Sequence, residues 1–270
     1  MNVISFKDIL FQFVILFSLG NIIVLLFYRA NTIGAKYFNT QTAFFIGGLL
    51  IGILVRLYQW SADGRPFDNS LYLYLLIFVL ACAYWLLVNR QFFHLASIML
   101  FLKIAIVFVA LYFQAQEVTQ NRLSIEVWLY YFHYLNSAIL IGSVFTAMML
   151  CHWFFVFHKL PIKYLKRLSH VFTFSLIFKT VLVGIVLWVW RLYLVGDYAH
   201  LLSAPLNVIF VVLRFGVGLL IPLFLAFGSE VTIKLPAVHS AIGLLYLAVI
   251  FVFAGEVLGQ YISLIFQIPF

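Results

Sequence analysis

Long apolar runs, broken by short polar segments, repeat along the whole chain. A membrane-spanning helix needs about 20 mostly apolar residues, and eight runs reach roughly that length. The breaks between runs carry residues typical of turns, such as the Asp-Gly-Arg-Pro sequence at 63–66 and Gly196-Asp197. The pattern predicts eight membrane spans, at residues 9–28, 42–60, 70–88, 92–115, 127–157, 165–195, 203–228 and 236–265.

Composition supports a membrane protein. The chain is 66% hydrophobic and 9% charged, whereas an ordinary globular domain is about 45–50% apolar and about 25% charged. We therefore predict an all-α, polytopic transmembrane helix bundle that forms a single integral membrane domain over residues 1–270. The loops are too short for a soluble catalytic domain, so chemistry outside the membrane would require a partner.

The positive charges predict an orientation. Lys and Arg accumulate in cytoplasmic loops, where they also meet anionic lipid, so the net charge of +8 suggests lipid rather than nucleic acid as a partner. The side favoured as cytoplasmic has eight of these residues near span ends, against five on the other side. We expect a multi-pass protein of the inner (cytoplasmic) membrane with both termini outside the cytoplasm. The eight are Arg29, Lys36, Arg90, Lys159, Lys163, Lys166, Arg167 and Lys234, and the five are Lys7, Arg56, Arg65, Arg122 and Arg191.

Four ionic residues lie well inside apolar runs, where each is a functional candidate because burying a charge in lipid is costly. Arg214 and Glu256 lie at a similar depth, roughly 14–17 Å below the outer surface at a rise of about 1.5 Å per residue. An ion pair between them would offset the cost of burying either alone. It would either fix the register of the helices or border a polar cavity for a quinol headgroup or a proton path. Lys103 and Lys179 have no obvious partner and can extend toward the membrane surface.

Histidines supply the second group of candidates. His94, His152, His170 and His239 are all expected near the cytoplasmic ends of their spans. Two imidazoles at one depth can provide the axial ligands of a b-type haem, and we take His152 and His239 as the candidate ligands of the haem iron. A neutral imidazole can also bind a quinone carbonyl or relay protons, a role open to His170 as well. The alternative is that all of them are ordinary residues at helix ends.

Small residues predict where helices pack closely. Ala138, Gly142 and Thr146 recur every fourth residue in the fifth span. Such spacing lets two helix backbones approach each other, so we interpret this stripe as a packing seam rather than a binding site.

The last span carries a family resemblance. It reads Ala-Gly-Glu-Val-Leu-Gly-Gln-Tyr over residues 254–261, and together with eight spans and outside termini it resembles the membrane anchor subunits of the dimethyl sulfoxide and polysulfide reductase type. The family's final span often has an acidic-small-small-Gly-Arg-aromatic run, and Gln260 stands here in place of the Arg. The resemblance implies a helical bundle that binds menaquinol or ubiquinol and passes electrons to an iron–sulfur subunit on the outer face.

The sequence therefore favours a membrane subunit of a respiratory electron-transfer complex. Such a subunit would anchor iron–sulfur or cytochrome partner subunits, contact lipids, and exchange electrons with a quinone or a b-type haem, with Arg214 and Glu256 lining the path. Two alternatives use the same residues: a transporter or proton/ion channel subunit, and a purely structural anchor. The chain contains no Walker loop, no His-Glu-x-x-His and no Gly-x-Ser-x-Gly motif, so nucleotide hydrolysis and the common hydrolase chemistries are not indicated.

Overall fold

A computed structural model describes the protein at residues 6–27, 33–63, 69–119, 124–156, 161–193, 205–235, 237–266 and 268–270. This part of the chain is built of helices and contains no strand, which confirms the all-α prediction. The helices are α1 (Phe6–Val24), α3 (Ala35–Asp63), α4 (Asn69–Asn89), α5 (Phe93–Thr119), α6 (Ser124–Val156), α7 (Ile162–Tyr193), α9 (Pro205–Phe215), α10 (Ile221–Lys234) and α11 (Val238–Phe266). A short 3-10 turn, η1 (Leu25–Phe27), extends α1, and a π-helical segment, η2 (Gly216–Leu220), joins α9 to α10.

Eight helices in the described residues are long and apolar enough to cross a membrane, so the predicted number of spans is confirmed. Their ends differ from the predicted ones by several residues. The second span begins at Lys36 and the fourth ends at Thr119. Backbone hydrogen bonding continues a helix through polar residues, whereas the apolar run reports only the part suited to hydrocarbon.

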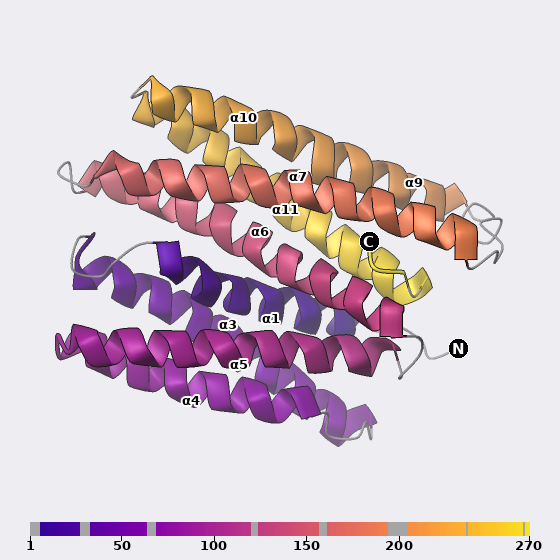
Figure 1. The fold of residues 1–270 in the computed structure, drawn as a ribbon, viewed down its shortest axis with the longest axis horizontal. Helices are drawn as coiled ribbons and strands as arrows, with labels where there is room; N and C mark the ends of the chain where they lie inside the picture. The colour runs from indigo at the N-terminus through magenta and orange to yellow at the C-terminus, as the bar shows by residue number, and fades with distance from the viewer. Residues whose placement is uncertain are drawn as a thin grey trace.

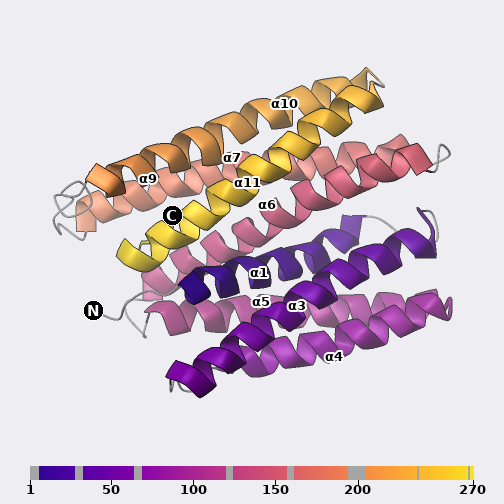
Figure 2. The same cartoon turned by 180° about the vertical axis from the view of Figure 1, so that it is seen from behind.

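The spans run side by side and alternate in direction (Figures 1 and 2). Helices α1 and α6 lie at the centre of the bundle. In the most apolar stretch of each, 72% and 78% of the residues are buried, against 33% in α4 and in α5. We call the end of the bundle at which α1 begins and α11 ends the terminus face, and the other end the opposite face. The orientation of the protein, that is, which of the two ends lies on the cytoplasmic side, stays a prediction from the count of Lys and Arg.

The centre of the bundle is the seam between α1 and α6, and it confirms the predicted small-residue stripe. A side-chain carbon on Gly20 would overlap the backbone of Ala138, and one on Gly142 would overlap the backbone of Gly20. One turn farther along, the Thr146 hydroxyl donates to Asn21 Oδ1 at 3.2 Å. Glycine at both crossing points therefore lets the two backbones touch.

The seventh span is interrupted by η2. Pro222 lies two residues beyond the end of this segment and has no N–H to donate to the carbonyl of Gly218, four residues earlier. Loss of that bond gives a physical reason for the wider π turn over Gly216–Leu220. Helical π segments of this kind occur frequently at functional sites, and this one begins two residues after Arg214.

Candidate functional site

A network of buried ionic groups joins three spans near the middle of the bundle. Glu256 on α11 accepts a hydrogen bond from Arg214 Nη2 on α9 at 2.9 Å, so the predicted ion pair is confirmed. The second carboxylate oxygen, Oε2, lies 3.4 Å from Lys179 Nζ on α7. All three side chains are at most 1% exposed. The charges therefore depend on one another for compensation, because all three side chains are buried inside the bundle.

Lys179 differs from the sequence expectation, which gave it no partner and a route to the surface. Its ammonium donates to Ser137 Oγ at 2.5 Å and lies 3.1 Å from His133 Nδ1. The side chain points into the bundle because these acceptors and Glu256 surround it there. His133 and Ser137, both on α6, are functional candidates that the sequence analysis missed, although their i, i+4 spacing placed them on one helical face.

The network carries more positive than negative groups. Arg214 and Lys179 share the single carboxylate of Glu256, and the remaining neighbours, Ser137 and His133, are not acids. An uncompensated cation in a low-dielectric interior is unfavourable. Such a centre is suited to bind an electron-rich or anionic group, or to release and take up a proton at the lysine.

Three glycines make room for the Arg214 guanidinium. A side-chain carbon on Gly259 would lie 3.0 Å from Cζ, and one on Gly255 would lie 3.1 Å from Nη1. Gly218, in η2, approaches Gly255 so closely that a carbon on either would overlap the other's backbone. The Ala-Gly-Glu-Val-Leu-Gly run of α11 thus provides both the carboxylate that binds Arg214 and, at its glycines, the space that the guanidinium occupies.

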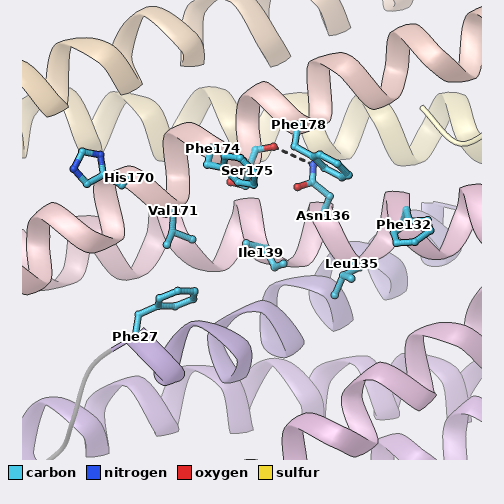
Figure 3. A pocket seen from close by; sticks show the side chains of 10 residues that line it. All are labelled: Phe27, Phe132, Leu135, Asn136, Ile139, His170, Val171, Phe174, Ser175 and Phe178. Atoms are coloured by element: carbon cyan, nitrogen blue, oxygen red, sulfur yellow. Dashed lines mark hydrogen bonds between the residues drawn. The ribbon is translucent and has the colours of Figure 1, made fainter.

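A groove between α6 and α7 opens on the surface (Figure 3), and two of its lining residues, Asn136 and Ser175, are close along the chain to residues of the network. Its volume is about 610 Å³, within the 300–1,000 Å³ range common for small-molecule sites. Asn136 Nδ2 donates to the carbonyl of Ser175 at 3.1 Å across the groove wall. Asn136 directly precedes Ser137, and Ser175 lies one turn before Lys179, so this contact separates the groove from the charges. The lining is mainly apolar and comprises Phe27, Phe132, Leu135, Asn136, Ile139, His170, Val171, Phe174, Ser175 and Phe178.

Lys103 lies on α5, outside the network, and the sequence expectation that it reaches the membrane surface is wrong. The side chain is 0% exposed, and Nζ has no hydrogen-bond partner among the described residues. Instead Nζ lies 3.7 Å from the ring centroid of Tyr84 and 5.0 Å from that of Phe45. Two aromatic faces provide the cation–π attraction that offsets part of its burial.

Replacing this lone lysine should not harm the fold. We expect Lys103→Met to leave the free energy of unfolding unchanged or to raise it by about 1–4 kcal/mol, the range seen when buried ionic groups give way to apolar ones of similar volume. Unfolding of the purified protein in mixed micelles, titrated with a denaturing detergent, measures this. A loss of stability would show that Lys103 has a further interaction, and Lys36→Met, at an exposed position, is the matched control.

The predicted histidine ligands lie at the surface. His152, His170 and His239 are all exposed. His152 Nδ1 is 3.2 Å from the Tyr246 hydroxyl, and His170 Nδ1 is 3.1 Å from Glu230 Oε1. Within the described ranges no three His, Cys, Asp or Glu side chains gather as metal ligands. The haem role of His152 and His239 stays a prediction.

Fold and site together define a polytopic α-helical integral membrane protein with a buried ionic centre. No model of a known protein family matches the chain, and no curated protein matches it either. The resemblance to reductase membrane anchors therefore stays a prediction that rests on residues 254–261 and the number of spans.

Proposed function

We propose that this protein is the quinone-reactive membrane subunit of a respiratory electron-transfer complex. The single observation that carries the proposal is the position of the α6–α7 groove beside the buried network. A lipid-soluble carrier needs an apolar opening on the bundle surface, and its redox-active ring needs polar partners at the inner end. The groove provides the apolar opening and the ionic centre provides the polar partners. Along α6 and α7, polar residues of the groove wall lie within one helical turn of residues of the ionic centre.

The groove residues fit a ring-bearing lipid. Four phenylalanines line it (Phe27, Phe132, Phe174 and Phe178), and aromatic side chains stack favourably on a planar ring. Asn136 contributes a polar group to the groove wall, and its amide can turn from the Ser175 carbonyl to a quinone carbonyl. When bound, the carrier would interconvert between quinone and quinol by exchanging two protons with its surroundings and two electrons with iron–sulfur or cytochrome partner subunits.

The ionic centre supplies the positive charge and the proton that the mainly apolar groove lacks. Lys179 holds a proton next to Ser137 and Glu256, one turn from Ser175 in the groove wall. Its positive charge stabilises negative charge that develops nearby, an effect that is larger in a low-dielectric protein interior than in bulk water. Glu256 and Arg214 keep the ammonium in place.

Filling the groove should weaken quinone binding. We expect Val171→Trp to weaken the binding of a short-chain menaquinone or ubiquinone analogue at least ten-fold, because the indole occupies the space of the ring. Val181→Trp is the matched control, since Val181 lies on the same helix, is 53% exposed and does not line the groove. Calorimetry of the purified protein in lipid nanodiscs measures both variants.

Two results would contradict the quinone proposal. One is the absence of measurable binding of either quinone analogue to the unaltered protein. The other is equal affinity in both tryptophan variants, which would place the quinone elsewhere. Co-purification of the chain with an iron–sulfur or cytochrome subunit from native membranes tests the redox complex separately.

A transporter is the second candidate, favoured by η2. The π segment interrupts the seventh span beside Arg214, and interrupted helices that present polar groups near the membrane centre form the substrate sites of many transporters. Uptake of a solute by liposomes that contain this chain alone, lost in Arg214→Gln, would favour this function over the redox subunit.

A further inference from the structure

Five buried polar atoms near the network have no hydrogen-bond partner among the described residues. They are Nε and Nη1 of Arg214, both amide atoms of Gln260, and the hydroxyl of Ser263. The three side chains are at most 1% exposed. Buried polar atoms in proteins are almost always satisfied, and where the chain provides no partner, ordered water usually does. The atoms therefore indicate water inside this part of the bundle.

The polar atoms on α11 lie along one helical face. Glu256, Gln260 and Ser263 follow i, i+4, i+7 spacing, which places them in a line about 10 Å long. The line starts at the ion pair and runs toward the terminus face, where α11 ends at Phe266. It thus leads from the buried carboxylate toward one surface of the bundle.

The same helical face is apolar in the other direction. Continuing back from Glu256 toward the opposite face, the buried residues are Val252, Ala248, Leu245 and Ala241, each 0% exposed. All four side chains are apolar, so none of them could form a hydrogen bond with water. The buried α11 face is therefore polar on one side of Glu256 and apolar on the other.

We propose that Gln260 and Ser263 line a water-filled half-channel that connects Glu256 with the aqueous phase at the terminus face. The waters would accept from Arg214 and Ser263 and bond both ends of the Gln260 amide. Protons can then move along the file between that aqueous phase and the Glu256–Lys179 pair, whereas the apolar α11 face on the other side of Glu256 offers no polar group to continue the file. This half-channel does not require that a quinone binds the groove.

The test is access of a water-sized cation to single cysteines. In a background with Cys82→Ala and Cys151→Ala, we compare Ser263→Cys and Gln260→Cys with Ile262→Cys, a neighbour that is 0% exposed inside an apolar cluster. Sealed proteoliposomes of known orientation are treated with Ag⁺ from one side. The thiols left free are then counted with a fluorescent maleimide after denaturation.

We expect Ag⁺ applied at the terminus face to block Ser263→Cys and Gln260→Cys at least ten-fold faster than Ile262→Cys. Equal rates at the three positions, or faster blocking from the opposite face, would overturn the proposal. Should Gln260→Cys fail to fold, the near-isosteric Ser263→Cys and its neighbour Ile262→Cys decide the question. The assay contains no quinone, so its outcome is separate from that of the groove experiment.

Discussion

Glu256→Gln should destabilise the protein by about 3–5 kcal/mol, because removing one member of a buried ionic group leaves the others without compensation. Arg214 and Lys179 would both lose the carboxylate that they share at 2.9 and 3.4 Å. Glutamine is nearly the same size, so the loss is electrostatic rather than steric. Detergent-titrated unfolding of the purified variant measures the difference.

Glu230→Gln is the matched control for this prediction. Glu230 pairs with His170, whose side chain is 58% exposed, and exposed pairs contribute about 0–1 kcal/mol. Adding Lys179→Met to Glu256→Gln should restore part of the loss, because it removes one of the two unbalanced cations. A Glu256→Gln variant as stable as the unaltered protein would show that the network is not held by charge.

Gly142→Ala should lower the free energy of unfolding by about 1–3 kcal/mol or more, the range for overpacking a well-packed interior. The new methyl group would overlap the backbone of Gly20 and lie 2.8 Å from the amide nitrogen of Asn21. Backbone cannot turn aside as a side chain does, so α1 and α6 would have to separate at the centre of the bundle. The melting temperature in detergent and the yield of monodisperse protein both report this.

Gly47→Ala is the control with the opposite expected sign. A side-chain carbon on Gly47 meets nothing within 4 Å, and alanine in a helix interior is favoured over glycine by roughly 0.5–1 kcal/mol. This variant should be as stable as the unaltered protein or more so. If both alanines behave alike, the close approach of α1 and α6 is not what stabilises the bundle.

The candidate site was predictable only in part. Arg214 and Glu256 were identifiable because ionic residues in apolar runs are rare, and their similar depth suggested that they pair. Depth follows from residue counting along a helix, since the rise per residue is constant. Lys179 lies equally inside its run, but its partners are on other helices, and residue counting does not say which helix faces which.

The sequence by itself determined the eight spans, the all-helical class and the identity of the residues that must avoid lipid. These follow from the free energy of moving side chains between water and hydrocarbon, which depends on residue type and run length alone. Only the tertiary structure decided that Lys179 joins Ser137 and His133, that Lys103 sits among aromatic rings, and that a groove opens between α6 and α7. The physical reason is that lipid tails are as apolar as a helix core, so both faces of a span are hydrophobic and the sequence pattern does not show which one turns inward.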